Sequence, residues 1–109
     1  MIYNIKDDKI LEKIKRIIID TVSPDKIILF GSRARGDFNK DSDYDILIIK
    51  NDIQNERLIT KKVNYELINE KIDKEFDLLA ITTDKWNKNI NKIGFIYKNI
   101  NTEGIILYG

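Results

Sequence analysis

The sequence has neither cysteine nor histidine among its 109 residues. The lack of cysteine excludes disulfides, thiolate zinc sites and cysteine nucleophiles. The lack of histidine excludes imidazole bases and imidazole metal ligands. Any acid–base or metal chemistry must therefore use carboxylates, and sites made only of oxygen ligands favour hard ions such as Mg²⁺ or Mn²⁺.

Long hydrophobic runs and a strong net charge are also absent. The longest unbroken apolar runs have four residues, as in residues 27–30, whereas a membrane helix needs roughly 20. The N-terminus shows no signal-peptide pattern, so we expect a cytoplasmic protein without a membrane partner. Lysine plus arginine is 19 and aspartate plus glutamate is 18, which argues against general nucleic-acid binding through a basic face.

The hydrophobic pattern predicts one small domain over residues 1–109. We expect helices over about residues 8–22, 53–72 and 83–99, and strands over 26–30, 43–49, 75–82 and 105–108. The second helix should place its core side at Leu58, Ile59, Val63, Leu67 and Ile68. The third should do so at Trp86, Ile90, Ile93, Phe95 and Tyr97. This order predicts an α/β (α+β) fold, a small mixed sheet with helices packed on it.

The most informative stretch begins where the first predicted strand ends, at Gly31-Ser32. A glycine directly after a strand permits a tight turn and the close approach of a ligand to the backbone. Ser32 opens residues 32–36, which form either a loop or one turn of helix whose free N–H groups attract phosphate. Arg33 and Arg35 either add positive charge to this turn or are simply solvated. We interpret the turn as a cradle for a polyphosphate.

Two aspartates, Asp43 and Asp45, follow ten residues after Ser32. Side chains at positions i and i+2 of a strand share a face, and two nearby carboxylates repel each other unless a cation or proton intervenes. The pair therefore predicts a site for two divalent cations about 3.5–4 Å apart, as used in nucleotidyl transfer. Asp77 lies in the predicted strand over residues 75–82. If this strand pairs with residues 43–49, Asp77 joins the site and binds a cation or takes a proton from an attacking hydroxyl. Ser42 either supports the site or caps a turn.

Together these residues resemble a known family. The run from Gly31 to Gly36, followed by the run from Ser42 to Asp45, is similar to the signature of the polymerase β-type nucleotidyltransferases, and especially of their minimal nucleotidyltransferases. The resemblance covers nearly the whole chain, including the strand around Asp77 and residues 103–108.

The resemblance implies a metal-dependent enzyme that transfers a nucleoside monophosphate, here expected to be AMP from ATP, to a hydroxyl and releases pyrophosphate. Two Mg²⁺ ions are expected, with Mn²⁺ as an alternative. The catalytic and metal-binding residues that it implies are Asp43, Asp45 and Asp77. The nucleotide-binding residues that it implies are Gly31, Ser32, Arg33, Arg35 and Ser42.

The resemblance also implies a partner, because this length leaves no room for a second domain to hold the acceptor. Minimal nucleotidyltransferases are often antitoxins that transfer AMP to a tyrosine of a helical HEPN ribonuclease toxin, and we expect such a toxin here. Two alternatives stay open: an antitoxin that acts by binding alone, and a catalytic subunit whose small-molecule or nucleic-acid substrate is held by a separate subunit. Formation of a homo-oligomer is also left open.

Overall fold

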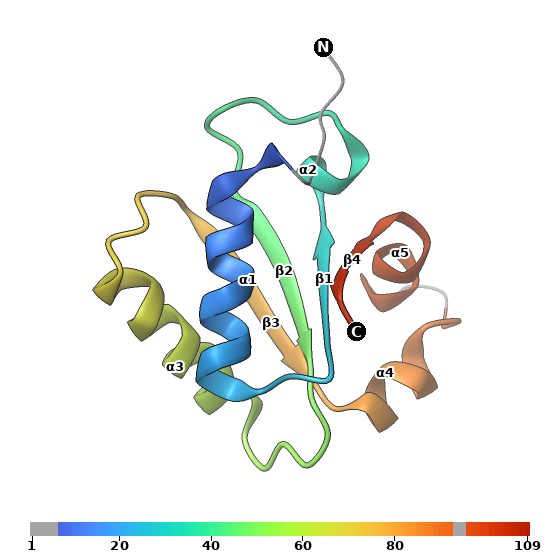
Figure 1. Cartoon of the computed structure of the whole chain (residues 1–109). Coiled ribbons are helices and arrows are strands. Elements are labelled where there is room, and N and C mark those ends of the chain that lie inside the picture. Colours follow the sequence, from blue (N-terminus) through green and yellow to red (C-terminus); the bar gives the residue numbers. More distant parts are fainter. Residues whose placement is uncertain (1–6, 93–95) are drawn as a thin grey trace.

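Four strands form one mixed sheet in the order β3-β2-β1-β4 in the computed structural model, which describes residues 7–92 and 96–109 (Figure 1). They are β1 (Lys26–Phe30), β2 (Tyr44–Ile49), β3 (Phe76–Ile81) and β4 (Ile105–Tyr108). β1 pairs antiparallel with both β2 and β4, whereas β2 pairs parallel with β3. The predicted mixed sheet with packed helices is confirmed.

Short polar side chains cap the N-termini of three of the described helices. The helices are α1 (Lys9–Val22), α2 (Ser32–Arg35), α3 (Glu56–Asn69), α4 (Thr83–Asn89) and α5 (Ile96–Glu103). The side chains of Asp8, Asn55 and Thr82 each accept a hydrogen bond from a backbone N–H in the first turn of α1, α3 and α4. Such caps satisfy N–H groups that have no partner within the helix.

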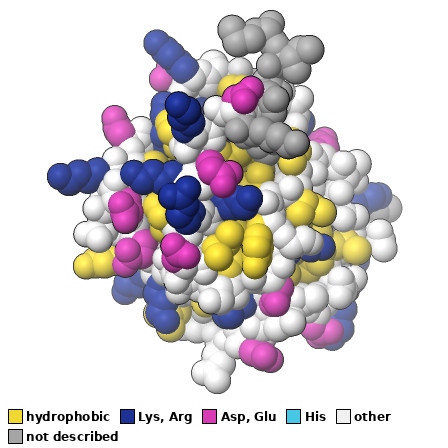
Figure 2. All heavy atoms as spheres, in the orientation of Figure 1, with side chains coloured by type: hydrophobic (Ala, Val, Ile, Leu, Met, Phe, Trp, Pro, Cys, Tyr) yellow, Lys and Arg dark blue, Asp and Glu magenta, His cyan; other side chains and the backbone are white. Residues whose placement is uncertain are grey.

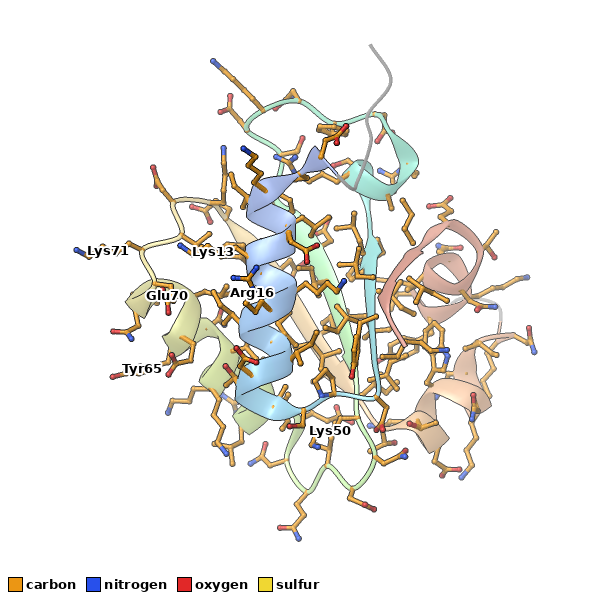
Figure 3. All side chains as sticks on the ribbon, in the orientation of Figure 1. Lys13, Arg16, Lys50, Tyr65, Glu70 and Lys71 are labelled. Carbon is orange, nitrogen blue, oxygen red and sulfur yellow. The ribbon has the colours of Figure 1, made fainter. Side chains whose placement is uncertain are left out.

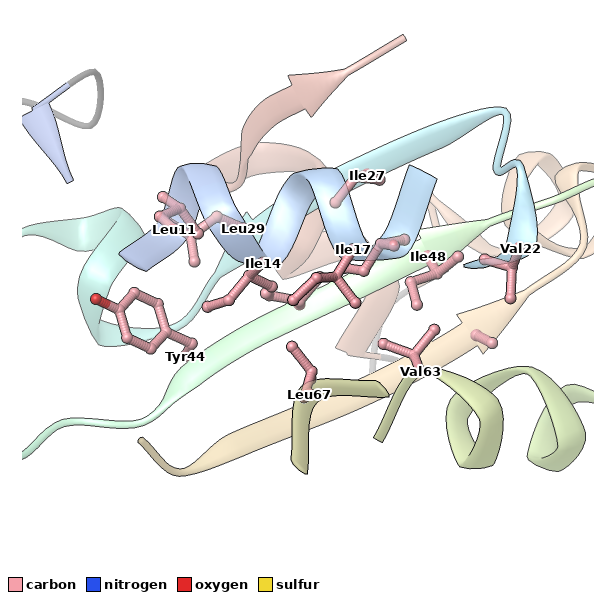
Figure 4. Close-up of a cluster of buried hydrophobic side chains, with 13 residues drawn as sticks. Leu11, Ile14, Ile17, Val22, Ile27, Leu29, Tyr44, Ile48, Val63 and Leu67 are labelled. Carbon is pink, nitrogen blue, oxygen red and sulfur yellow. The ribbon is translucent and has the colours of Figure 1, made fainter. Parts of the chain in front are cut away.

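The sheet separates two hydrophobic cores, because alternate residues of each strand face opposite sides. One face packs against α1 and α3 (Figure 4) and contains these buried side chains: Leu11, Ile14, Ile17, Ile18, Val22, Ile27, Leu29, Tyr44, Ile46, Ile48, Val63, Leu67 and Ala80. The other face packs against α4 and α5 through Ile28, Phe30, Leu47, Ile49, Ile81, Trp86 and Ile100. Because Asp45 alternates with Tyr44 and Ile46, it belongs to this second face.

The prediction for the core side of α3 was wrong at two positions. Val63 and Leu67 are buried, but Leu58 is 47% exposed and Ile68 is 77% exposed. Residues four apart follow one narrow stripe along a helix, and Ile59 continues the stripe of Val63 and Leu67 at the edge of the core. Leu58 and Ile68 lie off that stripe.

The single helix predicted over residues 83–99 was also wrong. α4 ends at Asn89, where the side-chain amide donates to the Lys85 carbonyl at 2.7 Å and so competes with the helical backbone. The chain between 87 and 91 contains three asparagines, which are weak helix formers. A separate helix, α5, begins at Ile96. The predicted core residues Ile93 and Phe95 lie outside the described residues.

The surface over α1 and α3 carries charges of both signs (Figure 2). Lys13 and Arg16 extend from α1, and Glu70 and Lys71 lie at the end of α3 (Figure 3). Within residues 7–92 and 96–109, no helix has the length and apolar character that a membrane span requires.

Candidate active site

Gly31 forms the turn between β1 and α2, with φ 73° and ψ −156°. Residues with a side chain rarely adopt such a positive φ. A Cβ atom at this position would also collide with the carboxylate of Asp45 and lie 2.9 Å from its Cγ. Glycine is therefore needed both for the backbone conformation and for space, and the turn lies directly against Asp45.

Asp45 is at the centre of the site because β2 lies between β1 and β3. It is aligned with Phe30 in β1 and with Asp77 in β3. Residues aligned across paired strands project to the same face of a sheet, so the Asp45 and Asp77 side chains are neighbours. Asp43 precedes Asp45 by two residues, just before β2 begins. The strand pairing on which the inclusion of Asp77 depended is thus present.

The three carboxylates interact electrostatically. Asp45 is half-buried, whereas Asp43 and Asp77 are exposed. The pKa of the Asp45 carboxyl is raised, first by burial and then by the negative charges of Asp77 and Asp43, while Arg35 acts in the opposite direction. Both neighbours therefore lie close enough to disfavour the charged form of Asp45. A cation between them would remove this repulsion.

The donor set fits a hard divalent cation. Among residues 7–92 and 96–109, no three acidic side chains are already arranged to hold a metal ion. However, carboxylate oxygens are ligands that Mg²⁺ and Mn²⁺ prefer, and Asp43 and Asp77 lie close enough to Asp45 for their charges to raise its pKa. Asp43 and Asp77 are exposed, so their carboxylates are accessible to an ion from solvent.

The guanidinium of Arg33 is buried and contacts neighbouring residues of the protein. It is 5% exposed, and its Nε and Nη2 atoms donate to the Ser42 carbonyl at 3.1 and 2.9 Å. Its Cζ lies 4.0 Å from the ring centroid of Tyr44 and 4.9 Å from that of Phe38. These contacts hold the loop that leads into Asp43. They favour a positioning role over the phosphate contact that the sequence predicted.

Ser42 also stabilises this loop. Its hydroxyl accepts from the Asn39 N–H at 3.0 Å, and its N–H donates to the Asn39 carbonyl at 3.1 Å. Of the two roles considered for Ser42, its contacts are those of a turn cap. Since Asp43 follows directly, the turn positions the first carboxylate, and nucleotide contact by Ser42 stays a prediction.

Arg35 is the exposed arginine beside the site. Its Nε is 3.3 Å from Asp37 Oδ2 and its Nη1 is 3.6 Å from Glu103 Oε2. Surface ion pairs of this kind contribute little to stability, and a contact of Arg35 with phosphate stays a prediction. Ser32 is half-buried at the start of the one-turn helix α2, and its contact with phosphate stays a prediction.

A pocket of about 270 Å³ opens beside Gly31, and it was not predicted from the sequence. It is lined by Phe30, Gly31, Arg35, Ile96, Asn99, Ile100 and Glu103. The last four have the spacing i, i+3, i+4, i+7, which places them on one face of a helix. That signal is present in the sequence, but it has meaning only once α5 is known to start at Ile96.

A larger hollow of about 540 Å³ lies along α3. It is lined by Asn55, Arg57, Leu58, Thr60, Lys61 and Asn64. All six come from one helix and its cap, and none is an acid or a glycine. The acidic side chains suited to metal binding therefore lie at the sheet end near Gly31 and not in this hollow, whose charged lining residues are the cations Arg57 and Lys61.

Comparison with known proteins decides the family. Residues 11–107 match the family model described as "Nucleotidyltransferase domain". The chain belongs to this nucleotidyltransferase family. This membership confirms the prediction, made from Gly31-Ser32 and the Asp43–Asp45 pair, that the protein is a nucleotidyltransferase.

Named relatives of this nucleotidyltransferase agree with that assignment. A protein of Methanocaldococcus jannaschii named "Putative protein adenylyltransferase MJ0604" is 36% identical over 83 residues, which make up 76% of this chain and 77% of that protein. A crystal structure described as a toxin-antitoxin with AMP-PNP matches 90% of this chain and 72% of that chain, with a TM-score of 0.66 and 21% identity.

A second crystal structure, of a variant MntA-HpeT toxin-antitoxin, matches the same shares of both chains with a TM-score of 0.65 and 19% identity. At such identities, the likeness to both structures is one of fold. It confirms the predicted nucleotidyltransferase core.

Proposed function

We propose that this nucleotidyltransferase transfers AMP from ATP to a hydroxyl group of a partner protein, in a reaction that depends on Mg²⁺ or Mn²⁺. The observation that carries the proposal is the position of Asp45, which lies against the Gly31 turn and beside Asp77. A phosphate-binding turn next to carboxylates that suit divalent cations is the arrangement that nucleotidyl transfer requires.

In the proposed reaction, Gly31 and Ser32 bind the β- and γ-phosphates through backbone N–H groups and the serine hydroxyl. Asp43 and Asp45 would hold two cations. When bound, these cations supply positive charge to the α-phosphate and to the pyrophosphate leaving group. Asp77 orients the acceptor hydroxyl and takes its proton while the hydroxyl oxygen bonds to the α-phosphorus and the bond from that phosphorus to pyrophosphate breaks.

The proposed acceptor is a cognate toxin. Support comes from the relative named a protein adenylyltransferase and from the toxin-antitoxin complexes that share the fold. By the resemblance to minimal nucleotidyltransferases, the toxin is a HEPN ribonuclease and the acceptor is one of its tyrosines. A tyrosine hydroxyl, with a pKa of about 10 in solution, becomes a competent nucleophile beside a cation and a carboxylate. The proposed location is the cytoplasm, as expected from the sequence.

The test combines the purified protein with α-labelled ATP, Mg²⁺ and the product of the adjacent gene, and then measures the mass of each protein. We expect one or more AMP units on the neighbour. The double variant Asp43→Ala, Asp45→Ala should lose transfer, because it removes the two carboxylates proposed to hold the cations. Omission of Mg²⁺ in the presence of a chelator should have the same effect.

Asp41→Ala is the matched control. Asp41 is an exposed aspartate of the same loop, and its charge is not among those that raise the pKa of Asp45. This variant should transfer AMP at the wild-type rate. Full transfer by the double variant would refute the mechanism. A double variant that binds and still neutralises the neighbour would support neutralisation by binding alone.

A further inference from the structure

The pocket lined by α5 belongs to the same end and the same face of the sheet as the three carboxylates. Phe30, at its base, is aligned with Asp45 across the β1–β2 pair. Gly31 borders both the pocket and the Asp45 carboxylate. α5 forms the far wall, beside β1 and β4 (Figure 1). A molecule bound at Asp45 therefore has the pocket directly next to it.

The lining of the pocket suits a neutral flat group better than a phosphate. Phe30 and Ile100 are buried apolar side chains, and Ile96 is an apolar side chain that stays 48% exposed at the rim. The only cation of the lining, Arg35, is already paired with Asp37 and Glu103. A phosphate would meet the Glu103 carboxylate and an apolar wall, which oppose a negative charge.

The polar groups of the lining are those that recognise the edge of a nucleobase. The Asn99 amide offers one acceptor and two donors, and the Glu103 carboxylate offers only acceptors. A carboxylate pairs with the amino group of a base, and an asparagine amide forms paired hydrogen bonds with adenine. The volume of about 270 Å³ is slightly below the roughly 300–1,000 Å³ of pockets that hold a whole drug-sized ligand, so it suits one part of a nucleotide.

We propose that this pocket binds the base of the nucleotide, specifically a purine that carries an exocyclic amino group, and that Asn99 selects it. This inference rests on the proposed function, because the phosphates of the same nucleotide must lie at Gly31. The ion pair between Arg35 and Glu103 connects α2 and α5 beside the pocket. The apolar floor accounts for the preference for the larger, two-ring bases.

The experiment measures binding and needs no acceptor. Isothermal titration calorimetry in Mg²⁺ buffer would compare ATP, GTP, inosine triphosphate, UTP and inorganic tripolyphosphate. Inosine triphosphate is the decisive probe, because its purine has no exocyclic amino group. We expect ATP or GTP to bind about tenfold more tightly than inosine triphosphate, UTP or tripolyphosphate, the scale of one good paired hydrogen-bond contact to a base. Whichever of the two is preferred identifies the base.

Asn99→Ala should remove most of that preference while it leaves tripolyphosphate binding unchanged. Asn101→Ala is the matched control, since Asn101 is an exposed asparagine of the same helix that does not line the pocket. It should behave as the wild-type protein does. Thermal unfolding of both variants would show that each is folded.

The outcomes separate this inference from the function on which it rests. Equal binding of all four nucleotides and tripolyphosphate, or equal behaviour of the two asparagine variants, overturns the base pocket and leaves the phosphate and metal site intact. If neither ATP nor tripolyphosphate binds to the wild-type protein, the proposed function fails and the base pocket fails with it.

Discussion

At the scale of single residues, Gly31 and Gly36 lie in one short motif but are glycines for different reasons. Both have positive φ, 73° and 90°. A Cβ at Gly31 would strike the Asp45 carboxylate, whereas a Cβ at Gly36 would meet nothing within 4 Å. Gly36 is therefore needed only for its backbone conformation, and Gly31 is needed for its conformation and for the site.

Replacing each glycine with alanine separates the effect of backbone strain on stability from the effect of contact with Asp45. Gly36→Ala should lower the free energy of unfolding by about 1 kcal/mol, from backbone strain alone. Gly31→Ala should lower it by about 2–4 kcal/mol, because overpacking against Asp45 adds to the strain. Urea unfolding of both variants would measure the difference. Equal losses would contradict the close approach of Gly31 to Asp45.

At the scale of secondary-structure elements, α3 shows that hydrophobic spacing alone does not identify the buried face. Its sequence offers apolar residues on more than one side, and only the stripe through Val63 and Leu67 faces the sheet and α1. Tyr65 and Ile68, 67% and 77% exposed, remain on the outside. Figure 3 shows Tyr65 directed away from the body of the molecule.

A pair of leucine substitutions checks this assignment. Leu67→Ala should destabilise the protein by about 2–5 kcal/mol, because it opens a cavity under a side chain that is 1% exposed. Leu58→Ala should change stability by less than about 0.5 kcal/mol, as expected of an exposed helix position. Chemical denaturation of the two variants would measure both changes in the free energy of unfolding. A large loss of stability for Leu58→Ala would support the prediction from the sequence that Leu58 belongs to the core side of α3.

At the scale of the whole molecule, Tyr44 connects four elements close to the site. Its hydroxyl donates to Asp8 Oδ2 at 2.9 Å, at the start of α1. Its ring stacks on that of Phe76 in β3, with 6.1 Å between the ring centroids. The guanidinium of Arg33, from α2, lies over the Tyr44 ring as a cation–π partner. Burial, followed by the hydrogen bond to Asp8 and its negative charge, raises the pKa of Tyr44 to about 12.

This shift predicts a loss of stability at high pH. A tyrosine in the unfolded chain loses its proton near pH 10. Below that pH the tyrosine is protonated in both the folded and the unfolded protein, so its full contribution to the free energy of unfolding is present. Between pH 10 and about 12 the unfolded state ionises first, and the free energy of unfolding should fall by about 2–3 kcal/mol through this group. Guanidinium unfolding across pH 9–12 would measure it.

Two phenylalanine variants isolate that contribution. Tyr44→Phe should lack this part of the decline, so that its stability approaches or exceeds that of the wild-type protein as the pH rises. Tyr65→Phe, at an exposed position of α3, should follow the wild-type curve. Parallel curves for the wild type and Tyr44→Phe would contradict the assignment.

The sequence by itself determined the local parts of the site. Gly31-Ser32 directly after a strand, and two aspartates two residues apart on the next strand, need only the chain geometry of a turn and a pleated strand to predict a phosphate cradle and a carboxylate pair. The family match then confirms the nucleotidyltransferase. These features are readable because the residues that interact are close in the sequence.

Only the tertiary structure decided what joins those parts. The parallel register of β2 and β3 places Asp77 beside Asp45. Arg33 is buried and donates to the Ser42 carbonyl in the loop that leads to Asp43, which favours a positioning role. Asn99 and Glu103 reach the pocket because α5 packs near the end of β1. Such contacts depend on how distant segments pack together, and no local spacing encodes that choice.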